Sequence, residues 1–273
     1  MSNEPVSDPT PDEISDAFEP LLREPDQAGV FSDFDGTLAP IVENPRDAVP
    51  LEDAVRALGA VARRFARVGV ISGRPASFLL RHLEGVPVRM WGLYGLERVV
   101  EDSEGESMIE PSAEADEWRA AIREAASQLE EEVGKRLAVE RKGLSVALHF
   151  RRAPELEDLA RESVESIAES RGLVVHPGRM SFELRPPVTG DKGTVLEEAA
   201  SGLRAACFFG DDSGDVDAFD ALDRLAQNEG MATVKVAVQS EEMPDELLER
   251  ADLVVDGPQG VVKVLRLVAG EAD

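Results

Sequence analysis

The stretch GVFSDFDGTLAPI, residues 29–41, decides how the rest of the chain is interpreted. Two carboxylates only two residues apart, Asp33 and Asp35, follow an apolar run that is typical of a buried strand. Two negative charges so close together repel each other, and burying them is costly unless a cation binds them. The stretch therefore predicts a buried strand that ends in a binding site.

Strand and helix patterns alternate on the carboxyl side of this stretch. Residues 52–66 and 76–85 have apolar residues at helical spacing, and residues 67–71 and 88–92 have strand patterns. Such strands, alternating with helices, predict an α/β fold with a parallel sheet covered on both faces. The same order returns late in the chain, with helix patterns at 191–203, 214–222, 243–251 and 258–268 and strand patterns at 205–210, 232–238 and 252–256.

The middle of the chain has a different pattern. Two amphipathic helix patterns, 114–137 and 155–170, are accompanied by strand-like segments at 138–151 and 172–186. We therefore expect an α+β insert between two halves of one α/β core. The predicted parts are a disordered acidic N-terminal tail at 1–18, the first part of the core at 19–108, the insert at 109–183 and the second part of the core at 184–273.

The charge balance excludes several classes of function. Acidic residues number 55 against 29 basic ones, a formal net charge of −26, so neither nucleic acid nor an anionic membrane surface is an expected partner. The basic residues are mostly arginine, which fits either a salt-rich cytoplasm or a genome rich in G and C. The single cysteine, Cys207, excludes an internal disulfide. With no long apolar run and no secretory signal, we expect a cytoplasmic protein.

Polar residues cluster where the predicted strands end. In an open α/β sheet, ligands bind outside the carboxyl ends of the strands. Carboxylates, a hydroxyl and an ammonium are therefore expected at one edge, and Mg²⁺ held together with a substrate phosphate is the commonest setting for such a group. The four clusters are Asp33 and Asp35 with Gly36 and Thr37, Ser72 with Gly73 and Arg74, Lys192, and Gly210, Asp211 and Asp212 with Asp215.

The carboxylate pair is suited to phosphoryl transfer. One carboxylate attacks phosphorus and forms an acyl phosphate, and the other donates a proton to the leaving oxygen and then accepts one from water. Mg²⁺ and the ammonium of Lys192 offset the repulsion between carboxylate and phosphate, and Ser72 hydrogen-bonds a phosphate oxygen. Gly36 is expected to let the backbone approach the phosphate and to offer its N–H.

The four clusters together resemble the motifs of the haloacid dehalogenase (HAD) superfamily of phosphohydrolases. The segments DFDGTL, VISGR, GDKG and FFGDDSGD stand in the order of that superfamily. More closely, the chain is similar to trehalose-6-phosphate phosphatases, with a resemblance that runs from about residue 29 to residue 268. The segments that carry this narrower likeness are SDFDGTLAPI, VISGRP, GLYGLE, VERKGLSVALHFR, FELRPPVTGDKG and GDDSGDVDAF.

The resemblance implies a Rossmann-like HAD core and an α/β cap inserted between the second and third motifs. It implies a Mg²⁺-dependent phosphatase that hydrolyses trehalose 6-phosphate to trehalose and phosphate through an aspartyl-phosphate. Asp33 would be the nucleophile and Asp35 the general acid and base. The other implied roles are Mg²⁺ ligation by Asp33, the backbone carbonyl of Asp35 and Asp211, phosphate binding by Ser72 and Lys192, and orientation of a metal-bound water by Asp215.

The resemblance also assigns residues to the sugar. Glu140, Lys142, Arg151 and Glu183 match cap positions that face disaccharide hydroxyls in such enzymes. Glu97 faces the substrate or bonds to a neighbouring loop. Asp212 is either a metal ligand or a helix cap, and the cap or a place beside the metal ligands is favoured. The chain departs from the family pattern at Tyr94, where histidine is common, and at Gly214 and Val216.

Two other functions remain open from the sequence. The chain could act on a different sugar phosphate, such as sucrose phosphate or a glycosyl-3-phosphoglycerate, or it could be a sugar-phosphate sensor without activity. The sensor is disfavoured because Asp33, Asp35, Lys192 and Asp211 are all retained. We expect a monomer, with a small sugar phosphate as ligand and a trehalose-6-phosphate synthase as pathway partner.

Overall fold

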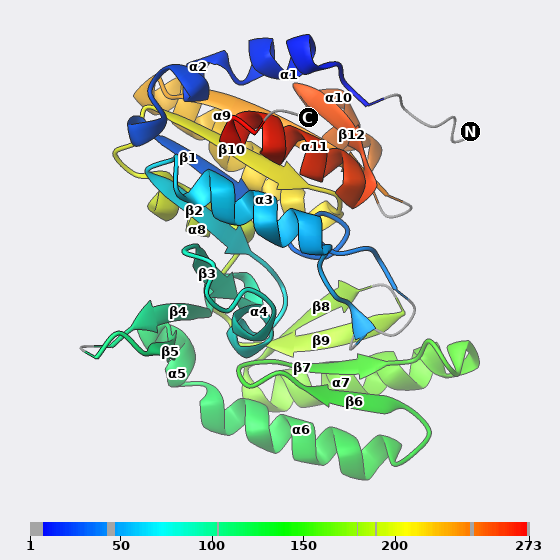
Figure 1. The fold of residues 1–273 in the computed structure, drawn as a ribbon. Coiled ribbons are helices and arrows are strands. Elements are labelled where there is room, and N and C mark those ends of the chain that lie inside the picture. The colour runs from blue at the N-terminus through cyan, green and yellow to red at the C-terminus, as the bar shows by residue number, and fades with distance from the viewer. Residues whose placement is uncertain are drawn as a thin grey trace. The chain divides into compact units, whose positions relative to one another are not determined.

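The chain is divided into two compact units. The computed structural model describes residues 8–42, 47–102, 104–178, 180–188, 190–240 and 243–271. One unit comprises 1–108 and 190–273, and the other comprises 109–189. Figure 1 shows the elements of both units with the labels used here.

The first unit is built on an eight-stranded sheet with the order β12-β11-β10-β1-β2-β3-β4-β5 (Figure 1). Neighbouring strands from β12 to β3 run parallel, and β4 runs antiparallel to β3. The α/β fold class is thereby confirmed. The strands are β1 (Ala28–Ser32), β2 (Arg67–Ile71), β3 (Arg89–Gly92), β4 (Glu97–Glu101), β5 (Ser107–Pro111), β10 (Ala205–Gly210), β11 (Ala232–Gln239) and β12 (Leu253–Asp256).

The strand order reverses direction at the centre of this sheet. From β1 the chain winds through β2 to β3 on one side, whereas β10, β11 and β12 continue outward from β1 on the other. The buried strand predicted from the opening stretch is β1, which pairs with β10 and β2 over its length. A crevice at such a reversal, outside the carboxyl ends of the strands, is where open α/β sheets bind ligands.

Helices cover both faces of the sheet because successive strand residues point to opposite sides. Val30 packs into a core with α1, α2, α3, α4 and α11, whereas the next residue, Phe31, packs into a second core with α8, α9 and α10. The helices are α1 (Pro11–Ala17), α2 (Glu19–Arg23), α3 (Glu52–Ala62), α4 (Ala76–His82), α8 (Lys192–Ala200), α9 (Val216–Glu229), α10 (Asp245–Arg250) and α11 (Gly257–Ala269).

The N-terminal segment is ordered where the structure describes it, so the prediction of a disordered tail over 1–18 is wrong for its later part. Residues 1–7 lie outside the described residues. Thr10 forms a capping box with Glu13 at the start of α1. Ile14 is buried in the core, and the Phe18 ring is stacked on Phe209 with centroids 6.1 Å apart. These apolar anchors outweigh the acidic composition on which the prediction rested.

The second unit is a four-stranded antiparallel sheet with two long helices packed on it. The strand order is β6-β7-β9-β8, and the apolar side chains of one sheet face form a core with α6 and α7. The long helix predicted over 114–137 is instead divided into α5 and α6. The elements are α5 (Ala113–Asp116), α6 (Arg119–Val133), β6 (Ala138–Arg141), β7 (Val146–His149), α7 (Glu157–Arg171), β8 (Val174–Gly178) and β9 (Ser181–Arg185).

The carboxyl boundary of the insert lies later than predicted. A boundary after residue 183 would cut β9, in which Leu184 pairs with β7 and Arg185 pairs with β8. The unit therefore extends to residue 189. The β4–β5 strand pair was not predicted either.

In the described part of the chain, no helix combines the length and the apolar character needed to cross a membrane.

The anchoring of the N-terminal segment can be measured. Phe18 is 0% exposed, so Phe18→Ala should lower the free energy of unfolding by about 3–5 kcal/mol through lost burial and a cavity. Urea unfolding measures the loss. Leu248→Ala is the control, since that side chain is 41% exposed. Equal losses in the two variants would show that Phe18 does not anchor the segment.

Candidate active site

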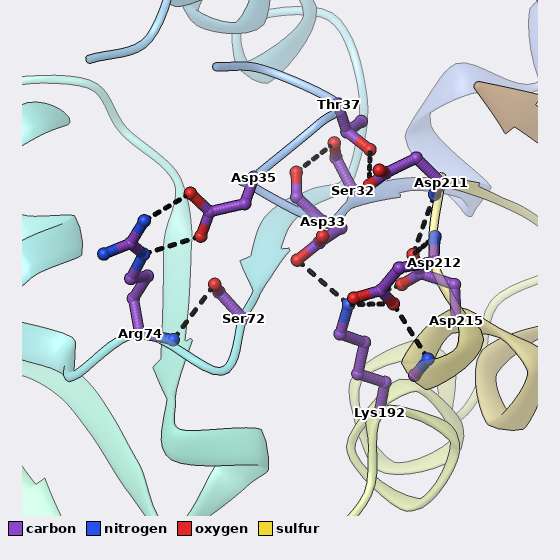
Figure 2. A network of polar contacts seen from close by, with 11 residues as sticks. Ser32, Asp33, Asp35, Thr37, Ser72, Arg74, Lys192, Asp211, Asp212 and Asp215 are labelled. Atoms are coloured by element: carbon purple, nitrogen blue, oxygen red, sulfur yellow. Dashed lines mark hydrogen bonds and ion pairs between the residues drawn. The ribbon is translucent and has the colours of Figure 1, made fainter. Parts of the chain in front are cut away.

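Three adjacent strands deliver the central residues of the site. Asp33 follows β1, Asp211 follows β10 and Ser72 follows β2, and all three are buried. The backbone N–H of Asp33 donates to the carbonyl of Phe209 at 2.9 Å, so the ladder between β1 and β10 continues to Asp33. The sequence patterns placed these residues at one edge, and Figure 2 shows them together.

Lys192 lies at the centre of the carboxylates. It is the first residue of α8, and its side chain is only 2% exposed. Its Nζ lies 3.0 Å from Asp33 Oδ1 and donates to Asp215 Oδ1 at 2.6 Å. Burial alone would lower the pKa of Lys192, but Asp215 and Asp33 hold it well above its usual value. The lysine is therefore a charged ammonium held against Asp33.

The loop after β10 is organised by Asp215. One oxygen of this carboxylate accepts from the backbone N–H groups of Asp211 at 2.8 Å and Asp212 at 3.0 Å, while the other accepts from Lys192. Asp212 caps the short helix η5 (Ser213–Asp215) through a bond from the N–H of Gly214 at 2.8 Å. Of its two predicted roles, the structure thus shows the helix cap for Asp212.

The carboxylates outnumber the cation that contacts them. Asp33, Asp211 and Asp215 can each offer one oxygen within 4.8 Å of the others. Burial raises the pKa of Asp33 well above its usual value, that of Asp211 to about 8 and that of Asp215 to about 6. A buried set of oxygen donors with surplus negative charge fits a hard divalent cation such as Mg²⁺. Asp215, predicted to stand behind the ligands, belongs to this cluster itself.

Gly36 has a different role from the expected one. Its N–H donates to the carbonyl of Ala39 at 2.7 Å, within the turn after β1, so the expectation that this N–H would be offered to the phosphate is wrong. Its φ is +74°, which favours glycine, and a Cβ here would collide with the carboxylate of Asp211. The glycine therefore lets the β1 turn pass close to Asp211. Thr37 adds a bond from its Oγ1 to Asp211 Oδ1 at 3.4 Å.

Asp35 turns away from Asp33 and toward Arg74 (Figure 2). The Nε and Nη2 atoms of Arg74 donate to the two carboxylate oxygens of Asp35, each at 2.6 Å. Ser72 Oγ accepts from the backbone N–H of Arg74 at 3.2 Å and makes no cap bond to α4. The two aspartates of the opening stretch therefore have separate partners.

Glu97 was predicted either to face the substrate or to bond to a neighbouring loop. Its carboxylate accepts from the N–H of Ala76, the first residue of α4, at 2.9 Å, and the residue is buried. A negative charge at a helix N-terminus is stabilising. The structure therefore favours the structural contact over a sugar contact for Glu97.

Tyr94, which departs from the family pattern, lies beside Ser72 and Lys192. Its backbone has φ 58°, and its N–H donates to the carbonyl of Ser72 at 3.0 Å. A Cβ built on Gly73 would lie 2.6 Å from the tyrosine hydroxyl, so that glycine makes room for the ring. The adjacent Leu93 also has positive φ, at 49°. Backbone strain of this kind is frequent at functional sites, yet neither residue was assigned from the sequence.

The polar face of the insert sheet contains three of the four predicted sugar residues. Glu183 lies 3.2 Å from Lys142 Nζ and 3.3 Å from Arg185 Nη2, and Glu140 lies 2.9 Å from Nε2 of His149. Burial alone would raise the pKa of Glu183, but the two cations lower it to about 2. The fourth residue, Arg151, is exposed in the turn after β7.

Sequence reasoning missed two members of this face. His176 in β8 pairs across the sheet with Glu183, and Arg185 in β9 contacts the same carboxylate. Both occupy alternate positions opposite the apolar core residues, which is the signal that would have identified them. The face as a whole is charged and ion-paired, a composition that suits polar ligands.

A family model described as "Trehalose-phosphatase" matches residues 31–250 of the chain. Among curated relatives, a trehalose-phosphate phosphatase of Mycobacterium marinum is 36% identical over 233 residues, which are 77% of this chain and 56% of that protein. An uncharacterised glycosyl hydrolase of Mycobacterium tuberculosis is 35% identical over 203 residues, 71% of this chain but only 15% of that protein. The chain therefore spans about half or less of the length of these relatives.

Solved structures share the fold at low sequence identity. The C-terminal domain of a Candida albicans trehalose-6-phosphate phosphatase is 21% identical with a TM-score of 0.72, over 99% of this chain and 100% of that one. A trehalose-6-phosphate phosphatase related protein is 23% identical with the same TM-score of 0.72, over 89% of this chain and 97% of that one. Since the family model covers well over half of the sequence and all four clusters lie at one sheet edge, this chain belongs to the trehalose-phosphatase family.

Proposed function

We propose that this protein hydrolyses trehalose 6-phosphate to trehalose and inorganic phosphate through a phosphoaspartate. The observation that carries the proposal is the buried carboxylate of Asp33, held between the ammonium of Lys192 and the carboxylates of Asp211 and Asp215. An ammonium and a cation-binding carboxylate set beside one aspartate suit a substrate that brings a phosphate dianion to it.

The first half of the reaction forms the covalent intermediate. A carboxylate oxygen of Asp33 attacks phosphorus, and the bond between phosphorus and the sugar oxygen breaks. Asp35 enters this half protonated, with its oxygens still able to accept from Arg74, and gives its proton to the leaving oxygen, so trehalose departs as a neutral alcohol. Lys192 and Ser72, which flank Asp33, bind the phosphoryl oxygens. They stabilise the negative charge on those oxygens in the transition state.

The second half regenerates the enzyme. Water attacks phosphorus and gives its proton to Asp35, which lost one in the first half. The bond between phosphorus and Asp33 breaks, and inorganic phosphate leaves. Each turnover thus consumes one water molecule and returns both aspartates to their starting protonation.

We further propose Mg²⁺ as the cofactor. Asp33, Asp211 and the backbone carbonyl of Asp35 are the expected ligands, with Asp215 beside them. Within the described part of the chain no hydrogen bond ends on that carbonyl, which supports the assignment. When bound, the ion supplies positive charge that stabilises the phosphoryl oxygens and the attacking carboxylate.

Selection of the sugar is assigned to the polar face of the insert sheet. The reacting phosphate is the same in every sugar phosphate, so discrimination requires groups that meet the hydroxyls. Glu140, Lys142 and Glu183, fixed by their ion pairs, and Arg151 are the proposed contacts. A trehalose-6-phosphate synthase is the pathway partner that this substrate implies.

The nucleophile is tested by Asp33→Asn. The amide cannot attack phosphorus, so turnover should fall below a few per cent of wild type while the thermal unfolding midpoint shows that the fold remains. Asp26→Asn, at an exposed position, is the control and should retain full activity. Turnover by purified Asp33→Asn well above that level would refute the covalent mechanism.

Phosphate release from a panel of sugar phosphates tests the substrate. Trehalose 6-phosphate should give the highest kcat/KM, ahead of sucrose phosphate and a glycosyl-3-phosphoglycerate. A preference for another sugar phosphate would support the phosphatase activity but assign a different substrate. Binding of trehalose 6-phosphate without release from any member would instead identify a sensor.

The proposed Mg²⁺ dependence can be tested by thermal unfolding as well as by activity. Chelator should abolish turnover, and Mg²⁺ should restore it and raise the thermal unfolding midpoint of the apoprotein by roughly 5 °C at 100-fold excess over Kd. Burial raises the pKa of Asp211 to about 8 and of Asp215 to about 6, so protons compete with the ion below these values.

The stabilisation by Mg²⁺ should accordingly grow as the pH rises from 6 to 9. The sign follows because a carboxylate whose pKa is raised on folding costs stability once it ionises, and a bound cation removes that cost. Asp211→Asn should abolish the midpoint shift. Full activity in excess EDTA, with metal content checked, would refute the ligand assignment.

The sugar contacts are tested by Glu183→Gln and Arg151→Ala. Each should lower kcat/KM for trehalose 6-phosphate by roughly 10²-fold, since polar groups that lose their hydroxyl partners are left unpaired. p-Nitrophenyl phosphate, which carries no sugar, should be affected far less. Glu162→Ala, exposed on α7, is the control. Equal losses on both substrates would indicate a folding role, and no loss on either would place the sugar elsewhere.

A further inference from the structure

Arg74 is the side chain in contact with the proposed acid and base. Both carboxylate oxygens of Asp35 accept from its guanidinium, one from Nε and one from Nη2, at 2.6 Å each. The side chain of Arg74 is 15% exposed and that of Asp35 is 36% exposed. A two-point contact of this kind fixes direction as well as distance, which a single hydrogen bond does not.

The arginine is itself held at several points. Its backbone N–H donates to Ser72 Oγ at 3.2 Å, and its carbonyl accepts from the N–H of Leu93 at 2.9 Å. Its guanidinium lies over the ring of Phe78, 4.6 Å from the centroid, and that ring packs edge-on against Phe34 at 5.5 Å. The guanidinium therefore lies on the ring of Phe78, which Phe34 links to the core.

Asp35 lacks comparable support from its own segment. Its backbone lies in the turn after β1, fixed by bonds from Gly36 and Ala39 to neighbouring carbonyls. Its side chain is more than a third exposed, whereas that of Asp33 is 4% exposed and lies against Lys192. A partly exposed carboxylate samples several rotamers unless a partner selects one. Arg74 is the residue that makes this selection.

We propose that Arg74 is a positioning residue for Asp35, which sets the direction from which this carboxylate exchanges protons with the leaving oxygen and with water. The inference rests on the proposed function, because it takes Asp35 as the acid and base. It adds a role for the arginine of the SGR segment, which binds neither phosphate nor metal in this scheme. Lysine cannot replace it, since an ammonium cannot hold two oxygens in one plane.

A positioning role predicts a dependence on the leaving group. p-Nitrophenolate leaves without a proton, phenolate benefits from one, and a sugar alkoxide requires one. Arg74→Ala should lower kcat by roughly 10-fold or more for the sugar phosphate that wild type hydrolyses fastest, and less for phenyl phosphate. For p-nitrophenyl phosphate the loss should stay below about threefold, with KM nearly unchanged for all three.

Three further variants sharpen the measurement. Arg74→Lys should be as impaired as Arg74→Ala within about threefold, because the charge alone does not restore the two-point contact. Arg81→Ala, at an exposed arginine on the following helix α4, should behave as wild type. In an Asp35→Asn background, Arg74→Ala should cause no further loss beyond about twofold, since its effect passes through Asp35.

Two results would overturn the positioning role of Arg74. Equal losses on all three esters, or a further loss in the Asp35→Asn background, would show that Arg74 acts on phosphate or on folding and would overturn the proposal. Thermal unfolding midpoints separate the folding case, and Arg74→Gln offers a second, less disruptive variant. The aryl esters contain no sugar, so this test stands even if wild type rejects trehalose 6-phosphate and the proposed substrate fails.

Discussion

A buried ammonium surrounded by carboxylates is the interaction on which the rest of the first unit depends. Lys192 is stable as a charged group inside the protein only because Asp33 and Asp215 lie within hydrogen-bonding distance of it. Asp33 directly follows β1, and Asp215 ends the short helix η5 after β10; these two strands are adjacent only because the sheet reverses its winding. The topology, the glycine at position 36 and the loop held by Asp215 all bring these groups together.

The two aspartates of the opening stretch are distinguished by environment rather than by chemistry. Asp33 is buried and faces Lys192, whereas Asp35 is partly exposed and faces Arg74. The residue between them, Phe34, is fully buried, so the backbone turns and the two carboxylates diverge. One carboxylate is therefore set beside cation-binding groups and the other beside a rigid guanidinium. The proposed division of labour between a nucleophile and a proton carrier depends on that difference.

Much of this arrangement follows from sequence pattern, because alternation places polar strand ends on one edge. Asp33, Ser72 and Asp211 were located in this way, and so was the α/β class, whereas Lys192 begins helix α8 and was located from its GDKG segment. Pattern does not reveal which partner a partly exposed side chain selects, so the contact between Asp35 and Arg74 was missed. The prediction for the N-terminal segment relied on its acidic composition and was wrong, because the apolar residues Phe18 and Ile14 anchor an acidic helix there. At Gly36 the pattern suggested a ligand contact, whereas the structure shows a backbone turn.

The pairing of β1 with β10 has a consequence for how the protein is made. Asp33 and Asp211 stand 178 positions apart (211 − 33), so one edge of the central strand has no partner until most of the chain has been synthesised. At about 5–20 residues per second the delay is roughly 10–35 s. Residues 109–189, which have their own core, emerge in full within that interval. We expect that unit to form first on the ribosome, while the nascent first half waits with an open strand edge that chaperones can protect.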